Sequence, residues 1–232
     1  MDNWTDRCHK YTLVDGTSGF QINFAGMNFT DADIENMSKR FVGVHEEMLK
    51  IERGEIKNPD EHRKVTHFTD RSVYTGSEEY QDVEAFVEAV RTGKIVGSTG
   101  KKFEAAFING IGGSALGPQL LQMAINGPYW NEKSDAQRNG YLKIYFLDNT
   151  DTAGLADALQ VADLEKTLVV NISKSGGTQE TKNNMITCMN CYAAAGLDFA
   201  KHACAITMKD SELDQLSRGG NWLKVFEICL LY

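Results

Sequence analysis

The chain has 232 residues, enough for one large domain or two small ones, and its hydrophobic fraction of 42% and charged fraction of 24% are typical of a soluble globular protein. A formal net charge of -8 argues against a general nucleic-acid binder, which usually carries a basic face. The same charge would repel an anionic ligand, so binding one requires a local cluster of donors.

The chain has five cysteines without a regular spacing: Cys8, Cys188, Cys191, Cys204 and Cys229. Cys188 and Cys191 form a C-x-x-C pair inside a predicted helix and have no second ligand pair, which favours helix packing over a metal or redox site. Reduced thiols and a polar start predict a cytoplasmic protein without a signal peptide or a membrane span.

The sequence predicts that residues 1–95 form a mainly helical segment. A first long helix begins near Thr30, where Asp33 completes a capping box, and it ends at Gly54. Its apolar residues repeat at helical spacing, which predicts packing on a core: Ile34, Met37, Phe41, Val44, Met48 and Ile51. Ser77 caps a second helix, and a glycine-rich connector follows at residues 93–100. We therefore expect residues 1–95 to pack on a main domain formed by residues 96–232.

A polar stretch lies between these two helices and carries His62, Arg63, His67 and Arg71. The histidines could act as ligands or bases, but spacing fixes no acidic partner for them. A structural role in hydrogen bonding is the simpler interpretation, and no catalytic role is assigned to these four residues.

From residue 103 onward, apolar runs rich in β-branched residues alternate with helical patterns. We expect strands at residues 103–108, 142–147, 168–172 and 203–208, and a helix after each. The first of these helices spans about residues 115–124, with Pro118 in its first turn. Four strand–helix units in series predict an α/β fold, a parallel sheet with helices on both faces, whose ligands bind beyond the carboxyl ends of the strands.

One stretch between the third strand and its helix reads Ser-Lys-Ser-Gly-Gly-Thr-Gln-Glu-Thr, residues 173–181. Its glycines allow a tight turn, and the hydroxyls of Ser173, Ser175 and Thr178 together with Lys174 are donors suited to a phosphate monoester. The start of the helix adds a partial positive charge. An ordinary capped helix is the alternative, since serine, threonine and glycine are also the usual cap residues.

This stretch resembles the phosphate-binding loop of the glucose-6-phosphate isomerase family, which has the sugar isomerase (SIS) fold. Residues 110–118, Gly-Ile-Gly-Gly-Ser-Ala-Leu-Gly-Pro, are similar to the first glycine-rich turn of that family. Residues 58–67 are similar to its N-x-x-E-x-R-x-x-x-H segment. The three matches fall in the expected order and span most of the chain.

The resemblance implies that Ser173, Lys174, Ser175 and Thr178 hold the phosphate. It places Gly113 and Ser114 on the sugar side and Glu180 at the edge of the site. The implied reaction interconverts glucose 6-phosphate and fructose 6-phosphate in glycolysis and gluconeogenesis through an enediolate, without a metal or organic cofactor. The implied partners are a sugar phosphate and, for the full-length family, a second copy in a homodimer, with no nucleic acid and no membrane.

Two rival interpretations remain. A dinucleotide-binding dehydrogenase would need a third glycine where Ala115 stands, and its acidic residue would be Asp148, which lies well beyond the usual distance of about 20 residues from the turn. A non-enzymatic SIS module that binds a phosphosugar would share the phosphate turn. The helical first segment and the match at residues 58–67 favour the isomerase family.

The end of the chain departs from the family. Residues 221–226 match the approach to the next family segment, but residues 227–232 do not. The resemblance puts the general base and the other catalytic groups beyond Tyr232, so no catalytic residue is assigned here. We expect a truncated or frame-shifted first SIS domain that is inactive alone and exposes apolar surface, which favours self-association.

Overall fold

The computed structural model describes residues 3–58, 63–64 and 73–228, and the chain divides into two compact units, residues 1–65 and 66–232. The sequence match at residues 58–67 lies almost entirely outside the described residues. His62, His67 and Arg71 lie outside them as well. Of that stretch, only the backbones at Asn58, Arg63 and Lys64 are described, and they belong to a short antiparallel pair.

The described part of the first unit has two helices, α1 (Trp4–Lys10) and α2 (Asp31–Glu52), and two small antiparallel pairs of strands. The strands of these pairs are β1 (Thr12–Val14) with β2 (Gln21–Asn23), and β3 (Ile56–Asn58) with β4 (Arg63–Lys64). Arg7 organises its beginning, because its guanidinium donates to the carbonyls of Ala25, Met27 and Phe29.

The predicted capping box at the start of α2 is confirmed. The hydroxyl of Thr30 accepts from the amide of Asp33, and the carboxylate of Asp33 accepts from the amide of Thr30. The helix ends at Glu52, just before Gly54, which adopts a positive φ of 74°. Within its own unit α2 buries no side chain, so the packing of its apolar stripe stays a prediction.

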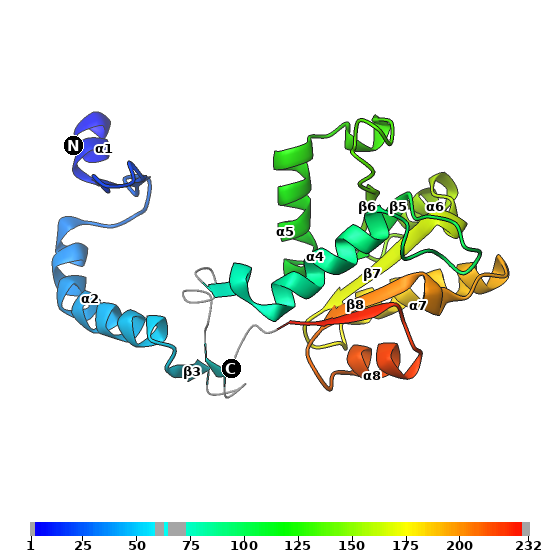
Figure 1. Ribbon diagram of the computed structural model, residues 1–232. Coiled ribbons are helices and arrows are strands. Elements are labelled where there is room, and N and C mark those ends of the chain that lie inside the picture. The colour runs from blue at the N-terminus through cyan, green and yellow to red at the C-terminus, as the bar shows by residue number, and fades with distance from the viewer. Residues whose placement is uncertain (1–2, 59–62, 65–72, 229–232) are drawn as a thin grey trace. The chain divides into compact units, whose positions relative to one another are not determined.

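The second unit is built on a five-stranded parallel sheet in the order β6-β5-β7-β8-β9 (Figure 1). Its strands are β5 (Ala105–Asn109), β6 (Lys143–Leu147), β7 (Thr167–Ser173), β8 (Ala203–Thr207) and β9 (Lys224–Glu227). Its α-helices are α4 (Glu78–Arg91), α5 (Gly113–Leu121), α6 (Thr152–Val161), α7 (Gln179–Ala194) and α8 (Glu212–Gly219). Short 3-10 turns cover Tyr74–Gly76, Trp130–Glu132, Leu164–Lys166 and Phe199–Lys201. The predicted α/β fold is confirmed.

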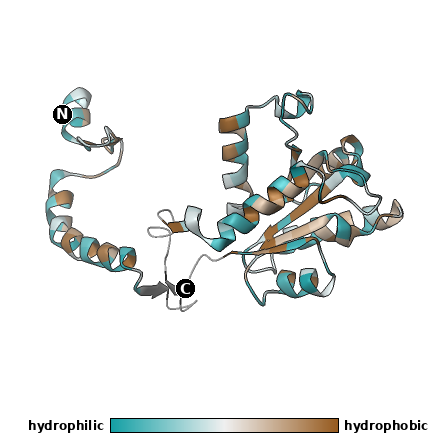
Figure 2. Cartoon of the chain, in the orientation of Figure 1, coloured by the Kyte–Doolittle hydropathy of each residue, from teal (hydrophilic) through white to brown (hydrophobic). Residues whose placement is uncertain are grey.

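Helices cover both faces of this sheet. On one face, α6, α7 and α8 pack through a core that includes Phe107, Val169, Tyr192 and Leu213. On the other face lies α4, whose Val90 packs with Phe103, Ala106, Leu168 and Cys204. Figure 2 shows that hydrophobic residues run along the strands between these layers. Since α4 is part of the layered structure, the residues from 78 onward belong to the unit that carries the sheet.

The helix that follows β5, α5, has other bounds than the predicted residues 115–124. It starts at Gly113, two residues earlier than expected, so Pro118 falls within the helix rather than in its first turn. A proline has no backbone N–H, and inside a helix it removes a backbone hydrogen bond. The helix ends soon afterwards and continues as one π-helical turn at Gln122–Asn126.

The C-x-x-C pair lies in α7, as predicted, and Cys188 is fully buried there. Burial raises the pKa of the Cys188 thiol to about 12, which keeps it protonated and unreactive near neutral pH. Among the described residues, no group of three histidine, cysteine, aspartate or glutamate side chains could hold a metal ion. No helix within the described ranges is long and apolar enough to cross a membrane.

His202 is a buried histidine that links the start of the sheet to the connector before β5. Its Nδ1 lies 3.1 Å from the carbonyl of Thr167, and its Nε2 accepts from the amide of Ser98 at 3.0 Å. A side chain at Gly97 would collide with its ring. The Nε2 acceptor role and the burial both favour the neutral ring, and burial lowers the pKa of His202 below its usual value of 6.5.

Because the pKa of buried His202 is lowered, we expect the protein to lose stability in mild acid. Below pH 6.5 the unfolded chain binds a proton at residue 202 more readily than the folded chain, so the free energy of unfolding falls as pH decreases from 7 to 5. Urea denaturation across this range measures the slope. His202→Gln should flatten this slope; equal slopes for wild type and His202→Gln would contradict the assignment.

Candidate functional site

The two glycine-containing turns begin at the carboxyl ends of neighbouring strands. β5 and β7 pair in parallel, with Asn109 opposite Asn171, so both strands end at the same edge of the sheet. The first turn runs from Gly110 into α5, and the second runs from Ser173 into α7. The predicted strand–turn–helix arrangement is present at both places.

Close contacts bring the first turn against the end of β7. A Cβ atom added to Gly110 would lie 3.2 Å from the carbonyl oxygen of Ile172 and 2.9 Å from Cβ of Ser114. Only glycine fits such an approach, because any side chain would displace one of these neighbours. Gly113 and Ser114 form the first two residues of α5. The structure therefore places them beside the strand that leads to Ser173 and Lys174.

The second turn and the start of α7 contain the other five predicted residues. Ser173 is buried at the end of β7, and its hydroxyl lies 3.0 Å from the hydroxyl of Thr178. Ser175 is exposed, and Lys174, Thr178 and Glu180 are half-buried. The amide of Gly177 donates to the hydroxyl of Ser175 at 3.3 Å. A single turn thus brings Ser173, Lys174, Ser175 and Thr178 together, and Glu180 follows in the first turn of α7.

The helices that follow the two turns, α5 and α7, have no side-chain cap at their N-termini, unlike the other α-helices described in the sheet-bearing unit. The side chains of Ser77, Asp151 and Ser211 accept from amides in the first turns of α4, α6 and α8. By contrast, neither Gly112 nor Thr178 makes a side-chain cap for α5 or α7. An ordinary capped helix is therefore not what residues 173–181 form. The amides and partial positive charges of both helix starts suit an anion at this edge.

The second turn is held in place from behind by the corner between β8 and α8. The hydroxyl of Thr207 donates to the carbonyl of Ser173 at 2.7 Å, and the amide of Met208 donates to the carbonyl of Lys174 at 3.2 Å. A Cβ atom at Gly176 would lie 2.7 Å from the amide nitrogen of Leu213. These contacts fix the turn before any ligand arrives, which lowers the entropic cost of binding.

One acidic side chain lies close to the second turn. A Cβ atom added to Gly177 would lie 4.0 Å from Oε2 of Glu212, the first residue of α8. Glu212 forms an ion pair with Lys182 of α7. The pair offsets a charge that would otherwise repel an anion at the turn.

The hollow beneath the second turn is too small for a sugar phosphate. Its volume is about 30 Å³, and Ser173, Thr178 and Thr181 contribute to its lining. Such a volume is close to that of one water molecule. An anion would therefore bind on the outer side of the turn, where Ser175 is exposed.

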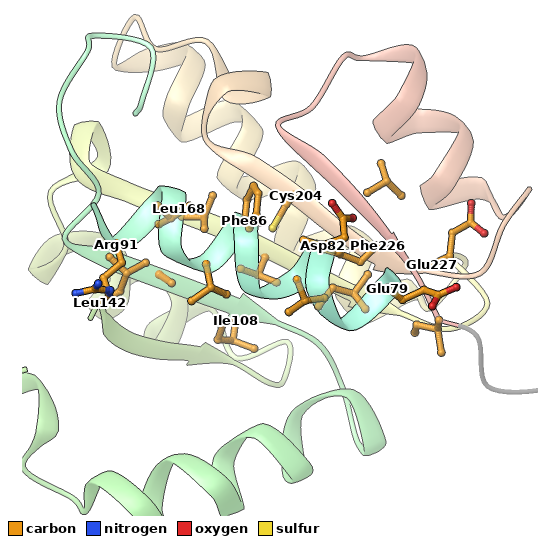
Figure 3. A pocket seen from close by; sticks show the side chains of 18 of the residues that line it. Glu79, Asp82, Phe86, Arg91, Ile108, Leu142, Leu168, Cys204, Phe226 and Glu227 are labelled. Carbon is orange, nitrogen blue, oxygen red and sulfur yellow. The ribbon is translucent and has the colours of Figure 1, made fainter. Parts of the chain in front are cut away.

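A much larger groove, of about 1120 Å³, lies on the opposite face of the sheet beside α4 (Figure 3). Its walls are mostly apolar and include Phe86, Ile108, Leu168 and Phe226, and none of the seven predicted site residues lines it. Its cations Arg91 and Arg218 are ion-paired with Glu88 and Asp214, each at 2.7 Å. This groove lacks the polar donors that a phosphate requires.

Sequence reasoning missed three buried polar residues below the turns: Asn109, Asn171 and Thr181. It also missed the support from Thr207, Met208 and Leu213, which are distant in sequence from the turn. The available signal was an asparagine at the same place in two apolar runs, directly before one glycine turn and two residues before the other.

Comparisons with known proteins find similarity to one family. A family model described as phosphoglucose isomerase matches residues 37–226. The chain is 39% identical to a glucose-6-phosphate isomerase from Citrifermentans bemidjiense over 95% of its length and 42% of that protein. It is 38% identical to one from Acaryochloris marina, covering 88% of this chain and 39% of that protein.

A solved structure is also similar. The crystal structure of a glucose-6-phosphate isomerase from Chlamydia trachomatis superposes with a TM-score of 0.65 at 27% sequence identity, covering 96% of this chain and 43% of that chain. The present chain therefore spans less than half the length of the relatives that it matches.

The contacts at Gly176 predict that this glycine cannot be replaced. It adopts a φ of 72°, and the close amide of Leu213 leaves no room for a Cβ atom. We expect Gly176→Ala to lower the free energy of unfolding by about 2 kcal/mol or more, since the left-handed conformation and the contact both oppose a side chain.

Gly177→Ala is the matched control, because the added Cβ would meet only Glu212 at 4.0 Å and the φ angle is not positive. Its effect should stay within about 0.5 kcal/mol. Urea unfolding of both variants measures the difference. Equal losses, or no loss in Gly176→Ala, would contradict the packing of the turn against α8.

Proposed function

Because this chain belongs to the phosphoglucose isomerase family, we propose that it binds glucose 6-phosphate and fructose 6-phosphate at the two glycine-containing turns. The observation that supports this most is the convergence of two helix starts without side-chain caps at one edge of the sheet. In the longer relatives, which are named glucose-6-phosphate isomerase, such a site would serve aldose–ketose isomerisation.

The chemistry of the second turn supports phosphate as the anchoring group. A phosphate monoester carries nearly two negative charges and three acceptor oxygens near neutral pH. Ser173, Ser175 and Thr178 supply hydroxyl donors, Lys174 supplies a cation, and α7 supplies amides. Gly113 and Ser114 would then face the sugar, with Glu180 at the edge of the site.

Binding the unreactive phosphate has a catalytic purpose in such a reaction. The proton moves between neighbouring sugar carbons, so the enzyme gains rate by holding those carbons in one orientation. Energy from the phosphate contacts can be used for that orientation even though the phosphate does not react. The anchoring site and the proton-transfer group can therefore lie on different parts of a protein.

We infer that the general base is not among the residues of this chain. None of the seven site residues is assigned proton transfer, and the relatives are more than twice as long as the stretch they share with this chain. We further propose that the protein is cytoplasmic, that the full-length form is a homodimer, and that it acts in both glycolysis and gluconeogenesis. The four cysteines that the structure describes are all free thiols, which suits the cytoplasm.

Replacing Lys174 tests the phosphate site. We expect Lys174→Ala to weaken fructose 6-phosphate binding by about 1–3 kcal/mol, the range for a charged hydrogen bond. Isothermal titration calorimetry measures the affinity. Lys201→Ala is the control, since Lys201 is an exposed lysine that precedes β8 at the opposite edge of the sheet. Equal affinities of Lys174→Ala and wild type would contradict the proposed site.

A coupled assay tests the assignment of catalysis. General acid–base catalysis contributes about 10²- to 10⁴-fold to a rate, so the purified chain should turn over at least about 100-fold more slowly than a full-length relative. Turnover near that of the relative would place the base within these 232 residues and overturn the inference.

A further inference from the structure

The core under the two turns changes from apolar to polar at the carboxyl edge of the sheet. Phe107 and Val169 belong to the apolar core between the sheet and α7. Asn109 and Asn171 follow two residues further along each strand, side by side in register, and both are fully buried. Thr181, the third residue of α7, is buried beside them with 3% of its surface exposed.

The amide of Asn109 joins three elements. Its Nδ2 donates to Oδ1 of Asn171 at 2.8 Å and to the carbonyl of Thr181 at 2.9 Å. Both partners are oxygen acceptors, so the amide cannot be turned around without placing oxygen against oxygen. Turning the amide of Asn171 around would place its Nδ2 against the Nδ2 of Asn109, two donors facing each other. One side chain on β5 is thereby bonded to β7 and to the first turn of α7.

These residues are a costly choice for a core. Oδ1 of Asn109, Nδ2 of Asn171 and the hydroxyl of Thr181 have no hydrogen-bond partner among the described residues. A buried polar atom without a partner destabilises a fold, and apolar residues of similar shape would avoid that cost. Each such atom in a native structure calls for an explanation other than stability.

The position of the Asn109 amide offers an explanation for these buried polar residues. Asn109 directly precedes Gly110, which is in close contact with Ser114 and with the end of β7. Thr181 lies three residues beyond Thr178, the N-cap of α7. The bonds of Asn109 therefore join the base of the first turn to the base of the second.

We propose that Asn109 and Asn171 are positioning residues that set the spacing between the two glycine-containing turns, and this rests on the proposed sugar phosphate site. They would act through the turns without touching the ligand. If the turns held the binding geometry only a tenth of the time, the affinity would fall about ten-fold.

The double variant Asn109→Leu/Asn171→Leu in the full chain separates positioning from stability. Leucine is close in size and carries no polar atom, so the urea midpoint should stay the same or rise. Amide hydrogen exchange in the free protein should nevertheless accelerate by about ten-fold at Ser114, Gly176 and Lys182, because the turns open more often. Exchange at Phe107, inside β5, should not change.

Two controls accompany it. Thr167→Val replaces a buried hydroxyl at the opposite end of β7 and should lower stability without a selective effect on the turns. Thr181→Val removes only the hydroxyl and keeps the carbonyl that Asn109 uses, so exchange at both turns should stay at the wild-type rate. If the double variant fails to fold, Asn109→Ala must accelerate exchange at the same two turns.

The inference is overturned if the amide exchange rates at the two turns equal those of the wild type in the double variant or in Asn109→Ala. A uniform acceleration that includes Phe107, with a lower urea midpoint, also overturns it, since that is the result of a purely structural role. Titration with fructose 6-phosphate should show about a ten-fold loss of affinity in the double variant. If the wild type does not bind this ligand, the proposed function fails, while the exchange result still decides the positioning role.

Discussion

The in-register parallel pairing of β5 with β7 is the interaction on which the rest of the site depends. Asn109 lies opposite Asn171, so both strands run to the same edge, β7 two residues further than β5, and both turns start there. A shift by one residue would move every side chain of one strand to the other face of the sheet. It would also separate Gly110 from the carbonyl of Ile172, which it approaches closely. The geometry of both turns follows from this one alignment.

Local polarity at this edge offsets the unfavourable charge of the whole molecule. The net charge of -8 repels an anion at long range, but distant charges are screened over about 8–10 Å. Two helix starts, three hydroxyls and Lys174 lie at one edge of the sheet. Contacts from Thr207, Met208 and Leu213 hold the second turn in its shape before binding. A rigid cluster of donors can therefore capture a phosphate on an acidic protein.

Local sequence patterns were sufficient for the architecture but not for the support of the site. The four expected strands are present within two residues of their predicted ends, because β-branched apolar runs indicate buried strands directly. The fifth strand, β9, is not among the strands expected from the sequence pattern. The capping pattern of residues 173–181 allowed two interpretations, and only the structure shows that Thr178 does not cap α7. The contact between Gly176 and Leu213 depends on the tertiary fold, and nothing near Gly176 in the sequence predicts it.

The central claim is that both turns bind the same phosphorylated ligand. Backbone amide chemical shifts of the ¹⁵N-labelled chain, recorded during titration with fructose 6-phosphate and then with fructose, test it directly. The account predicts that fructose 6-phosphate shifts the amides of Gly113 and Ser114 together with those of Ser175, Gly176 and Gly177, and that fructose leaves the second group unchanged. Shifts confined to one turn, or to the groove beside α4, would contradict it.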